Sequence, residues 1–148
     1  MKKILTIAIL MFITLGVNAQ SFNVDIIGLW GGTVSNTETG KESYMAFNFE
    51  YDSFSKQLTC HTLTRNDDGE IVNDTRFTNT SFTYQTNNAV YTWVNSGGIW
   101  TETQSYMFTL TEGRLQILHI RMVNNDKEGA TDNEVWGYMQ AGFLDELD

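Results

Sequence analysis

The chain contains no proline and only one cysteine, Cys60, among its 148 residues. A single cysteine cannot form an internal disulfide, so the fold must be stabilised by packing even in an oxidising compartment. After the first twenty residues, no stretch of ten or more residues shows a convincing helical period. The sequence therefore predicts no substantial helix in the body of the protein.

Positive charge is also scarce. Nine Lys and Arg residues stand against 18 Asp and Glu residues, which gives a formal net charge of -9. Such an acidic surface repels phosphate backbones and anionic lipid headgroups, and this argues against nucleic acid or a membrane surface as a partner. The same charge keeps an exported protein in solution.

The motifs that indicate an enzyme are missing or incomplete. There is no phosphate-binding glycine loop and no Gly-x-Ser-x-Gly elbow. His61 and His119 lack the close spacing of a metal site, and we expect neither a metal nor a cofactor. Cys60 and His61 are adjacent in a predicted strand and point to opposite faces, while a pair of Cys60 with His119 rests on no pattern. The acidic residues around Gly69 fit a turn better than a glycosidase site, so we expect no catalytic residues.

The N-terminus has the features of a bacterial signal peptide. Lys2 and Lys3 precede an apolar run over residues 4–15, and Val17-Asn18-Ala19 supplies small or modest side chains before Gln20. The run is shorter than a membrane-spanning helix requires. We therefore expect cleavage of residues 1–19, no membrane anchor, and a single domain over residues 20–148 in the periplasm or outside the cell.

The remaining chain alternates between polar and apolar residues in short segments. In residues 42–51, Met45, Phe47, Phe49 and Tyr51 fall on one face, as in a half-buried strand. Similar segments, joined by short turns rich in Gly, Asn and Asp, predict strands over residues 28–35, 42–51, 57–65, 70–77, 80–86, 89–95, 99–111, 114–123 and 132–140. This pattern predicts an all-β fold, an antiparallel up-and-down β-barrel of about eight strands, with a two-sheet sandwich as the alternative. The final residues, FLDELD, could form one turn of helix.

The start of the first predicted strand carries a short motif. Gly28 allows a tight bend, Trp30 can turn inward to close one end of a barrel, and Gly31 and Gly32 permit strong curvature. This Gly-x-Trp followed by a meander resembles the calycin superfamily of lipocalins, fatty-acid-binding proteins and avidins. The resemblance implies a lipocalin-like barrel whose floor contains Gly28 and Trp30, with a cation packed on the tryptophan. Arg121 fits that role best, and Arg114 second. The C-terminal helix and disulfide of many secreted lipocalins are missing, and Gly31-Gly32-Thr33 does not match the biotin-binding residues of avidins.

Aromatic residues cluster on single faces of the later predicted strands. An eight-stranded barrel either fills its interior with such side chains or holds one small ligand. The residues that we expect to line a ligand site are the aromatic side chains with two polar anchors: Tyr91, Trp93, Trp100, Tyr106, Phe108, Trp136, His119 and Arg121. In the alternative, the rings only fill the core.

Two functions remain open from the sequence. The first is an exported binding protein that holds a small hydrophobic or aromatic molecule inside its barrel. The second is an interaction or inhibitor module that binds a protein partner through the loops at residues 66–70, 95–98 and 124–133, with no internal ligand.

Overall fold

The computed structural model describes residues 24–75, 80–96, 100–125 and 134–148, so the expected signal peptide lies outside the described residues. A 3-10 turn at Val24–Ile26 precedes the strands. No helix in the described part of the chain is long and apolar enough to cross a membrane. The strands are β1 (Gly28–Asn36), β2 (Glu42–Asp52), β3 (Gln57–Arg65), β4 (Ile71–Asn73), β5 (Thr80–Gln85), β6 (Asn88–Ser96), β7 (Trp100–Thr111), β8 (Arg114–Asn125) and β9 (Glu134–Glu146).

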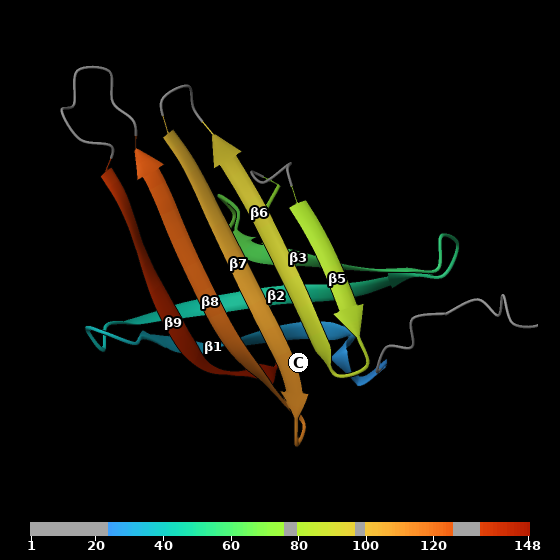
Figure 1. Ribbon diagram of the computed structural model, residues 1–148. Coiled ribbons are helices and arrows are strands. Elements are labelled where there is room, and N and C mark those ends of the chain that lie inside the picture. Colours follow the sequence, from blue (N-terminus) through green and yellow to red (C-terminus); the bar gives the residue numbers. More distant parts are fainter. Residues whose placement is uncertain (1–23, 76–79, 97–99, 126–133) are drawn as a thin grey trace, which may run out of the picture.

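All nine strands belong to one antiparallel sheet with the order β4-β3-β2-β1-β9-β8-β7-β6-β5. The first strand pairs with the last, from Trp30 opposite Glu146 to Asn36 opposite Gln140. The sheet curls so strongly that β1–β3 cross behind β5–β9, and the whole forms a half-barrel (Figure 1). The predicted all-β antiparallel meander is confirmed. The described residues contain nine strands, one for each predicted segment and one more than the eight or so expected of the barrel. No ladder in this part of the chain joins the edge strands β4 and β5.

The sheet folds over where β1 meets β9, and glycine is required there. A Cβ on Gly142 would lie 2.6 Å from the Thr33 carbonyl oxygen, and one on Gly32 would lie 2.4 Å from the Phe143 carbonyl oxygen. These close approaches let β9 bend from one layer into the other, as Figure 1 shows. The predicted strand end at residue 140 and the helical turn after it are therefore wrong, since β9 runs to Glu146 and buries Leu144 completely.

The core lies between the two layers and is rich in aromatic rings. Trp30 is 1% exposed and its Nε1 donates to the Ile26 carbonyl oxygen at 2.9 Å. Gly28, just before it, has a φ of 140°, a backbone conformation that favours glycine. Trp30 is thus a fully buried member of the core, anchored to the turn before β1. Tyr51, predicted on the same face as Met45, Phe47 and Phe49, is 40% exposed at the end of β2.

Candidate functional site

A pocket opens where β2 and β3 stop pairing. Their ladder runs from Asp52 opposite Gln57 to Phe47 opposite Thr62, and β3 then pairs with β4. The preceding part of β2 and the end of β3 separate and leave a cavity of about 470 Å³ between the layers. It is lined by residues of β2, β3, β4, β6 and β7 and by one residue after β4: Tyr44, Met45, Ala46, Phe47, Thr62, Leu63, Thr64, Arg65, Ile71, Asp74, Trp93, Gln104 and Tyr106.

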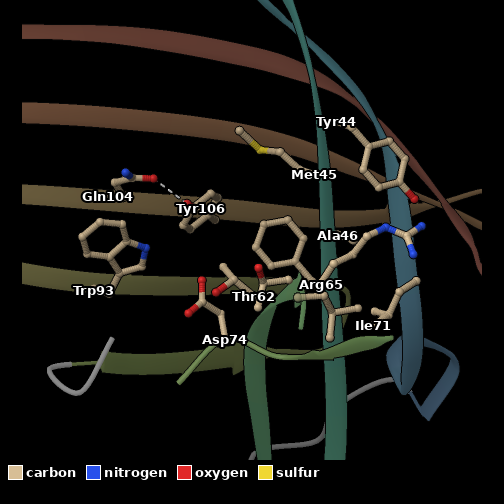
Figure 2. A pocket seen from close by; sticks show the side chains of 13 residues that line it. Tyr44, Met45, Ala46, Thr62, Arg65, Ile71, Asp74, Trp93, Gln104 and Tyr106 are labelled. Carbon is tan, nitrogen blue, oxygen red and sulfur yellow. Dashed lines mark hydrogen bonds between the residues drawn. The ribbon is translucent and has the colours of Figure 1, made fainter. Parts of the chain in front are cut away.

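The two sides of this pocket differ in character (Figure 2). Trp93, Gln104 and Tyr106 form the wall on the β6–β7 side, and Asp74, which follows β4, faces them from the other side. Trp93 and Tyr106 are buried, and Asp74 is only 7% exposed. At the outer end of the pocket, Arg65 is exposed and its Nη1 donates to the Gly69 carbonyl oxygen at 2.8 Å. The pocket therefore has an aromatic inner wall with polar groups set into it.

The aromatic wall is held by ring packing. Phe47 contacts Tyr106 and Phe108 edge to face, with centroid distances of 5.0 and 4.9 Å. Tyr91 stacks on Tyr106 at 5.9 Å. These contacts lock the rings from both layers against one another, so the wall is formed before any ligand arrives.

The phenols next to the pocket are neutral hydrogen-bonding groups. Burial raises the pKa of Tyr91 to about 12, and the nearby Cys60 and Asp74 also raise it. Burial likewise raises the pKa of Tyr106. Burial also raises the pKa of the Cys60 thiol well above its usual value, so this cysteine is a neutral packing group rather than a nucleophile.

A chain of hydrogen bonds leads from the pocket into the sheet. The Tyr106 hydroxyl donates to Gln104 Oε1 at 2.6 Å, and His119 Nε2 lies 3.0 Å from the same oxygen. The His119 ring stacks on Tyr106 with a centroid distance of 4.4 Å and an interplanar angle of 7°. Gln104 Nε2 donates to Glu102 Oε1 at 2.6 Å, which fixes the orientation of the Gln104 amide. His119 Nε2 therefore carries a proton and donates a hydrogen bond to Gln104 Oε1.

The other side of the His119 ring faces Gln140. His119 Nδ1 lies 3.0 Å from Gln140 Oε1, and Gln140 Nε2 lies 3.0 Å from Ser43 Oγ. An amide oxygen at Nδ1 suits an imidazolium, but burial is the largest influence on the ring and lowers the pKa of His119. Because the pKa of His119 lies below the ordinary value of a histidine, we assign a neutral ring at neutral pH.

Arg121 ends this chain away from the pocket. Its Nε donates to Glu102 Oε1, and its guanidinium lies 5.7 Å from the centre of the Tyr138 ring. Burial would raise the pKa of Glu102, but hydrogen bonds from Arg121 and Gln104 outweigh it and lower the pKa. Arg121 pairs with Tyr138 in the ladder, whereas Trp30 pairs with Glu146 eight positions further along β9. The expected packing of Arg121 on Trp30 is therefore wrong.

The structure brings together part of the predicted ligand site. Trp93 and Tyr106 line the pocket, and Tyr91 and Phe108 pack behind its wall. His119 and Arg121 belong to the polar chain and do not line the pocket. Trp100 and Trp136 lie in β7 and β9, with side chains outside the part that the structure describes. Of the predicted partner-binding loops, residues 66–70 form a described turn, and the other two lie partly outside the described residues.

Sequence reasoning missed several lining residues. Phe47 was placed on an inward face, but nothing in the sequence set it beside Tyr106. Thr62, Asp74 and Gln104 are isolated polar residues that no motif marks. Within the described ranges, no group of three or more His, Cys, Asp or Glu side chains is placed to hold a metal ion.

Comparison of the chain with protein-family models, curated proteins and solved structures found no match. The geometry of the pocket therefore carries the functional argument on its own.

Proposed function

We propose that this protein binds a small hydrophobic or aromatic molecule in the pocket between the two layers of the half-barrel. The observation that carries the proposal is a cavity of about 470 Å³ with a packed aromatic wall and a few polar groups. Small-molecule sites typically occupy about 300–1,000 Å³ and have this kind of lining. The ring of the ligand would lie against Trp93 and Tyr106, and its polar end would meet Gln104 or Asp74.

The fold supports a lipocalin-like version of this proposal. Each strand pairs with the next one in the sequence, except that β4 does not pair with β5. The first strand, β1, also pairs with the last, β9, as in a meander that closes on itself. We propose that the half-barrel is a calycin-type barrel that is open between β4 and β5. The signal-peptide features of residues 1–19 support export to the periplasm or the medium, which N-terminal sequencing of protein from fractionated cells would test.

The binding proposal is tested with a neutral apolar probe, N-phenyl-1-naphthylamine, titrated against tryptophan and probe fluorescence. Fatty acids, sterols, tetrapyrroles and aromatic metabolites then compete for the site. Thr64→Phe, which places a ring in the pocket, should weaken probe binding at least about tenfold, equivalent to about 1.4 kcal/mol. Trp93→Phe should remove most of the tryptophan response, because Trp93 is the described tryptophan that lines this pocket.

Thr59→Phe is the matched control. Thr59 lies on the same strand but on the opposite face, outside the pocket lining, and is half-buried like Thr64. It should bind the probe as the unmodified protein does. Equal weakening by both variants, or no binding by the unmodified protein to any compound, would contradict the proposal.

A further inference from the structure

Four consecutive rows on the outer face of strands β6–β9 hold no charged residue. The Arg114–Asp145 ion pair borders them, with the Arg114 guanidinium 5.0 Å from the centre of the Phe143 ring. Residues paired across an antiparallel ladder share a face, so the registers define four rows that point away from the core. The rows are Asn88–Thr109–Gln116–Phe143, Val90–Met107–Leu118–Ala141, Thr92–Ser105–Ile120–Met139 and Val94–Thr103–Met122–Gly137. We call these four rows the outer β6–β9 face. None of its positions holds Lys, Arg, Asp or Glu, in a chain with 18 acidic residues.

This face is apolar as well as uncharged. Its exposed side chains include Met122 at 53%, Phe143 at 44% and Met139 at 40%, and Leu118 and Ile120 in its centre are half-buried. In Figure 1 the strands β1–β3 lie on the other side of this layer, and no described segment covers the outer β6–β9 face. Exposed apolar side chains that gather on one face of a protein mark an interaction site.

The opposite outer face, formed by β1–β3, has a different character. Glu42, Glu50 and Asp52 project from β2 and are exposed. These three carboxylates lie away from the outer β6–β9 face. A partner that docks on this face must itself be uncharged and apolar there.

We propose that the occupant is a second copy of this chain, packed face to face on the outer β6–β9 face about a two-fold axis. Two copies with a formal net charge of -9 each repel one another wherever acidic surfaces meet. The four rows bring no charge of their own into the interface, and Arg114 at their border is already paired with Asp145. A two-fold axis through the outer β6–β9 face makes the same patch serve both copies.

The available area is sufficient for such a dimer. Strands about 4.8 Å apart with residues rising about 3.4 Å give four strands and seven residues a footprint of roughly 19 by 24 Å. The uncharged residues Ser81, Thr83 and Gln85 of β5 continue the same rows. With β5 included, two copies would bury on the order of 1,200 Å², the lower limit of standard specific interfaces. Facing sheets would then pack about 10 Å apart.

The test is the mass of the protein in solution, purified from cells that express the full-length chain. Sedimentation equilibrium at about 100 μM should give twice the mass of one chain, as expected for a weak to moderate dimer. The double variant Met122→Glu, Met139→Glu places four carboxylates in the interface of the dimer. It should raise the dissociation constant well over tenfold, because like charges facing each other across an interface cost several kcal/mol.

Phe54→Glu is the matched control, since Phe54 is 96% exposed in the turn between β2 and β3. It adds an acid in place of an exposed apolar residue and should leave the dimer unchanged. Val90→Glu, on a different strand of the same face, provides a second test if the double variant fails to fold by circular dichroism. A monomeric unmodified protein, or dimers that survive both sets of substitutions, would overturn the proposal. So would a monomer that sediments with neutral phosphatidylcholine vesicles, since lipid would then be the occupant.

Discussion

Phe47 joins the core to the pocket, and its removal should affect both stability and binding. The side chain is 1% exposed and meets Tyr106 and Phe108 edge to face at 5.0 and 4.9 Å. Truncation of a buried phenylalanine to alanine costs about 3–5 kcal/mol through lost burial and a residual cavity. Each aromatic pair adds about 0.5–1.5 kcal/mol. Because Phe47 makes two such pairs, we expect Phe47→Ala to fall in the upper part of the range for Phe-to-Ala truncations. It should lower the free energy of unfolding by about 4–5 kcal/mol, a large share of the total for a small domain.

The assay is urea denaturation followed by tryptophan fluorescence, together with titration of the naphthylamine probe. Phe54→Ala is the same substitution at a 96% exposed site and should change stability by less than about 0.5 kcal/mol. Phe49→Ala removes an equally buried ring that packs on Phe108 at 5.1 Å but does not line the pocket. It should match Phe47→Ala in stability, and only Phe47→Ala should change probe affinity.

Two results would refute this reasoning. If Phe47→Ala were as stable as Phe54→Ala, the ring would not be packed between the two layers. If Phe49→Ala changed probe affinity as much as Phe47→Ala, the probe would report general loosening of the core. Phe47→Leu, with a smaller loss of volume, preserves the comparison if the alanine variant is unfolded under all conditions.

Two further predictions concern pH and the fold of the sheet. The pKa of His119 is lowered in the folded state, so the unfolded chain binds the proton first. Stability should fall as the pH drops below about 6.5, by at most about 1.4 kcal/mol per pH unit, and His119→Gln should remove that part of the slope in urea titrations between pH 7.5 and 5. Gly142→Ala should destabilise by about 1–3 kcal/mol, because its Cβ would meet the Thr33 carbonyl oxygen at 2.6 Å. A more stable variant, as glycine to alanine gives at unhindered positions, would contradict the close crossing of β1 and β9.

The elements of this fold were predictable because their signals are local. Alternation identified the segment that contains Phe47 and Phe49, and the glycines at 40, 69 and 113 lie in turns with positive φ, as turn chemistry requires. The long C-terminal strand was not predicted. Its last part pairs with β1, more than a hundred positions earlier, and its polar residues around Leu144 give no clear period.

The fourth strand shows a second limit of local reasoning. The sequence predicted a strand over residues 70–77, whereas β4 ends at Asn73. Asp74 follows it with its side chain buried beside the pocket, and its backbone N–H donates to the Thr62 carbonyl oxygen at 2.7 Å. A buried carboxylate has no signal in an alternating pattern, because the pattern expects charged residues to face water.

The inward-facing aromatic residues of the site were predictable from local alternation, as the strands were. The position of the pocket in the sheet was not predictable. Tyr106 was placed correctly on an inward face, because side chains alternate between the two faces along its strand. The pocket, however, exists because the β2–β3 ladder ends at Phe47 and Thr62. Three more pairs in the same register would join Ala46 to Leu63, Met45 to Thr64 and Tyr44 to Arg65, and these six residues now line the pocket instead. The alternation is the same on both sides of that end, so hydrophobic pattern alone cannot reveal where two strands separate and a binding site opens.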